Sequence, residues 1–261
     1  STILTPVKAM KKSILSIGIA ALVMMMTACG TDGGGNSGTP DSGNDKEEST
    51  DESDKSQVGP KIEFQVSGDI DVENIQPGQK GKVSFNSFPT SYAEFRQVKL
   101  DMDRTPQGAV ALELMAAELY RRNHSEGEEA FKICNTTTNL NDVIKGFKDV
   151  FDGYEGRQKT PYQVAAFLEG ANWENGYNPT EPYTVNVEVS ANGATYSNTY
   201  QTDEISFIIF TQGSDSGSRL GVNALCTSKP GEPAGYIISS CPALYAQVRE
   251  ISFNATFNGL K

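Results

Sequence analysis

The chain has 261 residues, of which 33 are acidic and 22 are basic, so its formal net charge is −11. Nucleic-acid phosphates require basic surface, and we therefore expect no nucleic-acid partner for this acidic chain. The sequence contains four cysteines and one histidine, without CxxC or HExxH spacing. We expect no metal site and no cofactor.

Residues 1–28 have the features of a signal peptide for export. Two lysines follow Met10, the expected start of translation, and an apolar run covers residues 14–26. The run is too short to span a bilayer as a helix, which takes about 20 apolar residues. It ends in "MTACG", which resembles the bacterial lipobox, a signal whose cysteine becomes the lipidated first residue of the mature protein. We expect a lipid on Cys29; the alternative is an ordinary signal peptide, with Cys29 as a plain thiol.

Residues 29–60 are expected to form a disordered acidic tether. From residue 30 onward this stretch holds eight acidic and two basic side chains, and Val58 is its one large apolar residue. Such a segment cannot bury enough apolar surface to offset the entropy lost on folding, and its like charges extend it. With the lipid on Cys29 as the membrane anchor, the tether would hold a domain outside the cytoplasm, at a distance from the cell membrane.

The next part of the chain, residues 61–88, predicts a hairpin. Apolar and polar residues alternate over 61–67 and 80–85, which is typical of strands, and Pro77-Gly78 supplies a turn between them. The pair is either a small hairpin at the edge of the domain or the start of its main sheet.

The clearest element is a helix over residues 106–122. Thr105 is a good N-cap, and Pro106 suits the first helical position. Apolar residues occupy nearly every face, so we expect this helix to be buried at the centre of the domain. Its two glutamates, Glu113 and Glu118, are expected to mark a solvent-exposed edge.

Two further helices are expected after the central one. Apolar residues at helical spacing predict a helix that is capped by Asn139 or Asn141 and ends at Gly153. A second Thr-Pro opening predicts another helix over residues 160–170. The pattern of residues 89–100 is ambiguous, and a short helix is one structure that it allows.

The rest of the chain is expected to form a sheet. Residues with a period of two predict strands at 183–191, 194–201, 204–213, 219–226 and 234–241, and one bent strand or two over 244–257. Helices followed by an antiparallel meander are typical of an α+β domain. We therefore predict a single α+β domain over residues 61–261, with about three helices packed on an antiparallel sheet.

Three stretches carry a likeness to a known family: "DRTPQGAVALELMAAELYRRN", "TPYQVAAFLEGANWENGYNPTEPYTV" and "FTQGSDSGSRLGVNAL". Together they resemble a family of uncharacterised bacterial exported proteins, itself a domain of unknown function. The shared features are a Thr-Pro-x-Gly helix start, the loop from Gly170 to Thr184 and a Gly-x-Asp-Ser-x-x-Arg turn. The resemblance covers about residues 90–255. It implies one exported domain, and it implies no reaction.

Three cysteines remain if Cys29 carries a lipid: Cys134, Cys226 and Cys241. Cys226 and Cys241 flank a connection rich in proline and glycine. A disulfide between them would close a loop of about 15 residues and stabilise the fold by about 3 kcal/mol. An exported location permits this bond. The alternative is a pair of buried free thiols.

The stretch "FLEGANWENGYNPTEPYTV" contains the one tryptophan and is the first candidate for a ligand site. Trp173, Tyr177 and Tyr183, with Asn175 beside them, can form an aromatic platform for a sugar or a peptide. The alternative is a structural corner, in which Asn175-Gly176 makes a tight turn and the aromatic rings cover the core.

The segment 212–219, "QGSDSGSR", is the second candidate. It links two strands and opens no helix, so it is not a phosphate-binding loop. It is either a hairpin turn, in which Asp215 caps backbone amides and Arg219 pairs with a carboxylate, or the rim of a polar ligand site.

Catalysis has little support in the sequence. His124 would have to serve any Ser-His or Cys-His mechanism alone, and we expect it to be exposed and inert in a polar loop. The protein is therefore predicted to be a non-enzymatic lipoprotein, a binding or interaction module with a cell-envelope glycan or protein as partner. The alternatives are a pocketed domain that binds a small ligand, with or without an activity, and a structural protein of the envelope.

Overall fold

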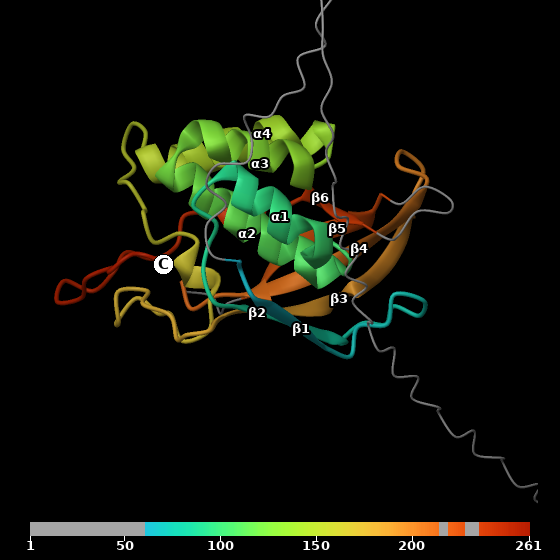
Figure 1. Cartoon of the computed structure of the whole chain (residues 1–261). Coiled ribbons are helices and arrows are strands. Elements are labelled where there is room, and N and C mark those ends of the chain that lie inside the picture. The colour runs from blue at the N-terminus through green and yellow to red at the C-terminus, as the bar shows by residue number, and fades with distance from the viewer. Residues whose placement is uncertain (1–60, 214–218, 228–234) are drawn as a thin grey trace, which may run out of the picture. The chain divides into compact units, whose positions relative to one another are not determined.

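The described residues form a layer of helices packed on one face of an antiparallel sheet (Figure 1). The computed structural model describes residues 61–213, 219–227 and 235–261, which all lie in the unit Glu52–Lys261. The predicted signal peptide, Cys29 and the tether fall outside the described residues. The α+β fold class is confirmed, with four α-helices in the described ranges rather than about three.

Six strands make up the sheet in the described part of the chain, and their order in space follows the sequence, β1-β2-β3-β4-β5-β6. The strands are β1 (Phe64–Gly68), β2 (Lys80–Phe85), β3 (Tyr183–Ser197), β4 (Thr202–Phe210), β5 (Arg219–Cys226) and β6 (Tyr236–Ser240). The predicted hairpin is present as β1 and β2, and Phe85 of β2 lies opposite Tyr183 of β3. The hairpin is therefore the start of the main sheet, with β1 at its edge.

The longest strand joins two predicted ones. β3 covers residues 183–191 and most of 194–201, because an irregularity between Val189 and Ala194 lets the strand continue past its bend. Along the sheet, side chains alternate between a buried face, such as that of Val187, and an open face, such as that of Asn186. The helices cover the buried face.

The central helix α2 spans Pro106–Arg122, as predicted. The Thr105 hydroxyl accepts the backbone N–H of Gly108 at 3.2 Å, and every residue from Pro106 to Tyr120 is buried. The expected solvent-exposed edge is wrong, since Glu113 and Glu118 are both fully buried. Each has polar partners inside the body, so burial does not leave its carboxylate without hydrogen bonds.

Three more helices surround α2: α1 (Tyr92–Met102), α3 (His124–Cys134) and α4 (Thr137–Asp152). The ambiguous segment 89–100 is thus helical over most of its length. α3 was not predicted, and His124 begins this helix instead of lying in a loop; its ring stacks on Tyr120 at 4.3 Å between centroids. None of the described helices is long and apolar enough to cross a membrane.

The predicted helix over residues 160–170 is wrong. A single 3-10 turn, η1 (Ala165–Phe167), is its only helical part, and the chain then runs beside β3. The backbone N–H of Glu169 donates to the carbonyl of Thr184 at 2.9 Å. The apolar residues that suggested a helix are buried, but their backbone N–H groups bond within successive turns, and only the end of the segment, at Leu168 and Glu169, bonds to β3.

The predicted strand or strands over residues 244–257 are also wrong. The 3-10 turn η2 (Pro242–Tyr245) is followed by irregular chain. The free edge of β6 is not available to this segment, because Thr136 donates its backbone N–H to Ile238 there at 2.9 Å. The segment bonds to loops, for example from Ser252 N–H to the Trp173 carbonyl at 2.9 Å.

Candidate functional site

The three aromatic residues proposed as a platform do not form an exposed surface. Tyr177 is fully buried, and its hydroxyl donates to the Arg249 carbonyl at 2.8 Å. Tyr183 is buried as well, and its hydroxyl accepts the backbone N–H of Lys261 at 2.8 Å. Trp173 is partly buried, with the guanidinium of Arg249 over its ring at 3.7 Å. These rings tie the loop and the end of the chain to the core.

Asn175 organises the loop from inside. Its side-chain amide donates to the carbonyls of Gly170 at 2.9 Å and Asn178 at 3.1 Å, and its oxygen accepts the N–H of Asn172 at 3.0 Å. Gly176 follows with a φ of 71°, and a side chain there would collide with the backbone of Thr256. The geometry matches the structural corner, the second of the two interpretations of this stretch.

The remaining candidates lie partly outside the described residues. Asp215 lies outside them, and the side chains of Arg219 and Cys226 do too, although both residues belong to β5. Cys241 carries a free, buried thiol, as does Cys134. Because the Cys226 side chain lies outside the described residues, the disulfide between Cys226 and Cys241 stays a prediction.

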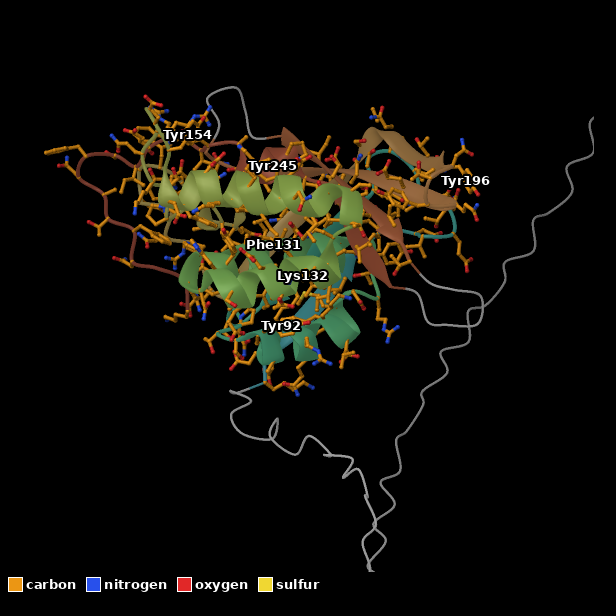
Figure 2. All side chains as sticks on the ribbon, turned by 90° about the horizontal axis from the view of Figure 1, so that it is seen from above. Tyr92, Phe131, Lys132, Tyr154, Tyr196 and Tyr245 are labelled. Carbon is orange, nitrogen blue, oxygen red and sulfur yellow. The ribbon has the colours of Figure 1, made fainter. Side chains whose placement is uncertain are left out.

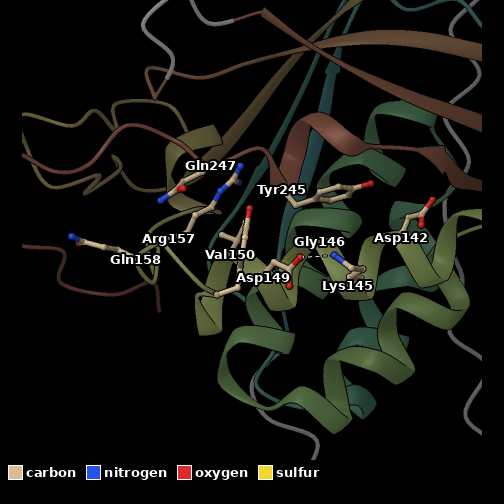
Figure 3. A pocket seen from close by; sticks show the side chains of 10 residues that line it. Asp142, Lys145, Gly146, Asp149, Val150, Arg157, Gln158, Tyr245 and Gln247 are labelled. Atoms are coloured by element: carbon tan, nitrogen blue, oxygen red, sulfur yellow. Dashed lines mark hydrogen bonds and ion pairs between the residues drawn. The ribbon is translucent and has the colours of Figure 1, made fainter.

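An open cleft of about 280 Å³ lies beside α4, where three segments far apart in the sequence meet (Figure 3). α4 supplies one wall, the turn that follows it supplies an end, and the end of η2 with the chain after it supplies the other wall. Its polar lining consists of Asp142, Lys145, Asp149, Tyr154, Arg157, Gln158, Tyr245 and Gln247. Charged, amide and aromatic groups thus face one small space, which suits a polar ligand.

Tyr245 is fixed against the helix by two neighbours. Gly146 has no side chain, and a Cβ at this position would collide with the Tyr245 ring. The ring also packs edge-on against Phe147, with centroids 5.6 Å apart. Burial raises the pKa of the Tyr245 hydroxyl from 10 to about 12, so the group keeps its proton at neutral pH as an ordinary tyrosine does and also in mildly alkaline solution. Figure 3 shows the ring lying between the Asp142 and Arg157 ends of the cleft.

Four charged side chains line the cleft, and two of them form an ion pair with each other. Lys145 and Asp149 form an ion pair of 2.8 Å on the surface of α4. Arg157 lies over the ring of Tyr154, 5.0 Å from its centroid. Within the described residues, neither Asp142 nor Arg157 has an ion-pair partner. The sequence shows these residues as an ordinary solvated helix face and a turn, and nothing in it links them to Tyr245.

A second depression lies on the open face of the sheet, opposite the helices. It has a volume of about 410 Å³ and a mostly apolar lining that includes Lys82, Asn186 and Phe210. Glu169 borders it, accepts a hydrogen bond from Asn186 at 3.0 Å and pairs with Lys82 at 3.2 Å. This groove offers an apolar floor with a neutralised polar edge.

The third cluster is fully buried and surrounds Glu113. The Asn135 amide donates to its carboxylate at 2.8 Å, and the thiols of Cys134 and Cys241 donate at 3.3 and 3.6 Å. No cation is among these three partners, and burial raises the pKa of Glu113 to about 7, against the smaller opposing effect of the three donors. Burial also raises the pKa of both thiols. In the described part of the chain, no three His, Cys, Asp or Glu side chains form a group that could hold a metal ion.

One family model matches the chain. It is described as Domain of unknown function (DUF6935) and covers residues 87–252. The likeness to a domain of unknown function over about residues 90–255 is thereby confirmed. No curated protein matches the chain, and no solved structure does.

Proposed function

The chain belongs to the family described as Domain of unknown function (DUF6935), and from that premise we propose that it is a lipid-anchored, extracytoplasmic binding module without enzymatic activity. The cleft beside α4 is its binding site, and its ligand is a small polar segment of the cell envelope. The predicted signal peptide with Cys29, the shape of the cleft and the chemistry of its lining support this proposal.

The anchor rests on Cys29 and on the acidic tether that follows it. A lipid group on a cysteine holds a protein at a membrane surface when it carries more than one chain. Incorporation of labelled palmitate into the full chain tests this step. We expect labelling of the wild type and none of Cys29→Ala, whereas equal labelling of both would refute the anchor.

The binding site rests on one observation: the cleft brings the side chains of three distant segments to one polar space. Its volume is close to the lower limit of about 300 Å³ for ligand sites. Two tyrosines offer apolar ring surface, and the amides and charges offer hydrogen bonds, a combination that suits envelope glycans and peptides.

Calorimetry with soluble cell-wall fragments, in which a saccharide carries its peptide, tests the cleft. The decisive variant is Tyr154→Ala, because this ring is 45% exposed and its loss should leave the fold intact. Tyr196→Ala is the matched control: that ring is 59% exposed on β3, and Figure 2 shows the two tyrosines on opposite sides of the described body.

We expect Tyr154→Ala to weaken binding by about tenfold, the effect of losing one aromatic contact of about 1.4 kcal/mol. Tyr196→Ala should bind as the wild type does. Equal losses in both variants, or no binding by the wild type, would rule out the cleft as the site for these fragments.

The groove on the sheet supports a second candidate, a pocketed domain that holds a small apolar ligand. Its volume of about 410 Å³ and its apolar floor favour this use. A screen of small aromatic and aliphatic compounds, with Phe210→Ala as the variant, tests it. Binding that survives this substitution would place the ligand elsewhere.

A further inference from the structure

We propose that the ligand of the cleft is a short peptide bound as a zwitterion, with its ammonium group beside Asp142 and its carboxylate beside Arg157. This inference rests on the proposed function and names the class of ligand for the same site. It follows from the positions of the charges, the length of the cleft and the hydrogen-bonding groups between its ends.

The charges select the two ends of the ligand. Lys145 and Asp149 lie in the middle of the α4 wall and neutralise each other at 2.8 Å. Asp142 and Arg157 lie at opposite ends of the cleft (Figure 3), and within the described residues neither has an ion-pair partner. A ligand with a positive end and a negative end would therefore meet a partner at each end. A neutral ligand would displace the water that is hydrogen-bonded to both charged groups, and it would offer no charged partner in exchange.

The length of the cleft sets the length of the peptide. Asp142 and Val150 both line it and are eight residues apart on α4. At a rise of 1.5 Å per residue, this separation is about 12 Å along the helix axis. An extended chain spans about 3.3–3.6 Å per residue, so three to four residues fit along this wall of the cleft.

The groups between the ends suit a peptide backbone. The Tyr245 hydroxyl is protonated at neutral pH, as it is at the ordinary tyrosine pKa of about 10, and its ring lies over Gly146. Gln247 donates its amide N–H to Thr160 at 3.4 Å, and this contact holds its amide group in place. Gln158 adds a second side-chain amide. Amide and hydroxyl groups of this kind pair with the N–H and C=O groups of an extended peptide.

Calorimetry on the full chain separates the ends of the ligand. The probes are trialanine with free termini, N-acetyl-trialanine, trialanine amide and the neutral trimer of N-acetylglucosamine. We expect trialanine to bind and each cap to weaken binding by about tenfold, the effect of one lost hydrogen bond between charged groups.

The protein variants match the probes. Asp142→Asn should weaken binding of trialanine by about tenfold and leave the binding of N-acetyl-trialanine unchanged. The substitution and the acetyl cap remove the same contact, between the peptide ammonium group and the carboxylate. Arg157→Gln should behave in the same way toward the amide. Lys148→Gln, on the same helix but outside the cleft, is the control and should bind trialanine as the wild type does.

The outcomes distinguish this inference from the proposed function. Capped peptides that bind as tightly as trialanine would overturn the zwitterion. Binding of the neutral saccharide that is lost in Tyr154→Ala, without binding of any peptide, would overturn the peptide and leave the cleft as the binding site. If neither the peptides nor the saccharide binds, the zwitterion is overturned, and if the cell-wall fragments do not bind either, the proposed function fails with it.

Discussion

Helices α2 and α4 differ in where their charged side chains lie: those at Glu113 and Glu118 of α2 are buried, and several of those of α4 line an open cleft. α2 is buried from Pro106 to Tyr120, and its carboxylates find their partners inside the body. α4 buries one side, with Val143 and Phe147 in the core, and its other side carries the charges of the cleft. Charges that are satisfied within the fold contribute to stability, whereas the ends of the cleft are open to a ligand. This contrast predicts which substitutions change folding and which change binding.

The two buried carboxylates of α2 differ as well. Glu118 receives two hydrogen bonds from Arg121, at 2.7 and 2.8 Å, and one from Arg122 at 2.9 Å. Arg122 also donates to the carbonyl of Leu260 at 2.7 Å, so this cluster holds the end of the chain. Glu113 has an amide and two thiols instead, without a cation among these partners.

The largest effect is expected from Glu118→Ala. Removing one partner of a buried ion pair leaves the other charges without compensation, and the usual cost is about 3–5 kcal/mol. The free energy of unfolding from urea titrations should fall by this amount. A loss below about 1 kcal/mol, the range of surface ion pairs, would mean that the two guanidinium groups reach water easily.

The next effect concerns pH and Glu113. Its pKa is raised from 4.5 to about 7, so the folded state keeps a proton between these pH values that the unfolded state releases. The free energy of unfolding therefore decreases as pH rises from 4.5 to 7, by about 3 kcal/mol from this group alone. The stabilisation is complete below pH 4.5 and absent above 7.

Glu113→Gln removes this dependence while keeping the shape of the side chain. The difference in unfolding free energy between wild type and variant should fall by about 3 kcal/mol over the same pH interval. Chemical denaturation at several pH values measures it. A difference that stays constant with pH would show that Glu113 titrates alike in the folded and unfolded chain.

A smaller effect is expected at the start of α2. The Thr105 hydroxyl caps the helix by accepting the N–H of Gly108. Thr105→Ala should lower the free energy of unfolding by about 1 kcal/mol, and Thr105→Ser, which keeps the hydroxyl, should recover most of it. If Ser and Ala variants are equally unstable, the lost methyl group and not the cap explains the change.

The smallest effects on stability belong to the cleft. Asp142→Asn and Arg157→Gln alter exposed side chains without ion-pair partners in the described residues, so each should change the free energy of unfolding by less than about 0.5 kcal/mol. Thermal unfolding followed by circular dichroism measures this. A large loss of unfolding free energy in either variant would mean that the residue stabilises the fold, as Glu118 of α2 is expected to do.

The elements that could be predicted are those whose sequence signals agree with their surroundings. α2 has a cap, a proline in the first turn and apolar residues on every face, and a buried central helix satisfies all three. β5 was predicted with its correct bounds, 219–226, because its neighbours on both sides are strands.

In other segments, contacts with the rest of the fold determine the secondary structure. Residues 160–170 have a Thr-Pro start like that of α2, but they form a run of turns whose end, at Leu168, pairs with β3. Residues 244–257 have a strand-like composition and no strand edge to join, since Thr136 occupies the edge of β6. α3 begins with a polar stretch that shows no apolar period, and packing of Phe131 into the core holds it in place.

The site was beyond sequence reasoning for the same reason. Aromatic residues in loops often bind ligands, which makes Trp173 and Tyr177 candidates from the sequence, yet in this corner they hold the end of the chain. The cleft depends on Tyr245 reaching α4 across about 100 residues of sequence, and only the fold places it over Gly146.

The most direct measurement is the change in backbone amide chemical shifts when trialanine is added to the isotope-labelled full chain. The account predicts that the shifted amides fall in residues 142–150, 154–158 and 245–247, and that Arg157→Gln reduces the changes. Shifts confined to the sheet groove around Asn186 and Phe210, or to the corner around Trp173, would contradict it.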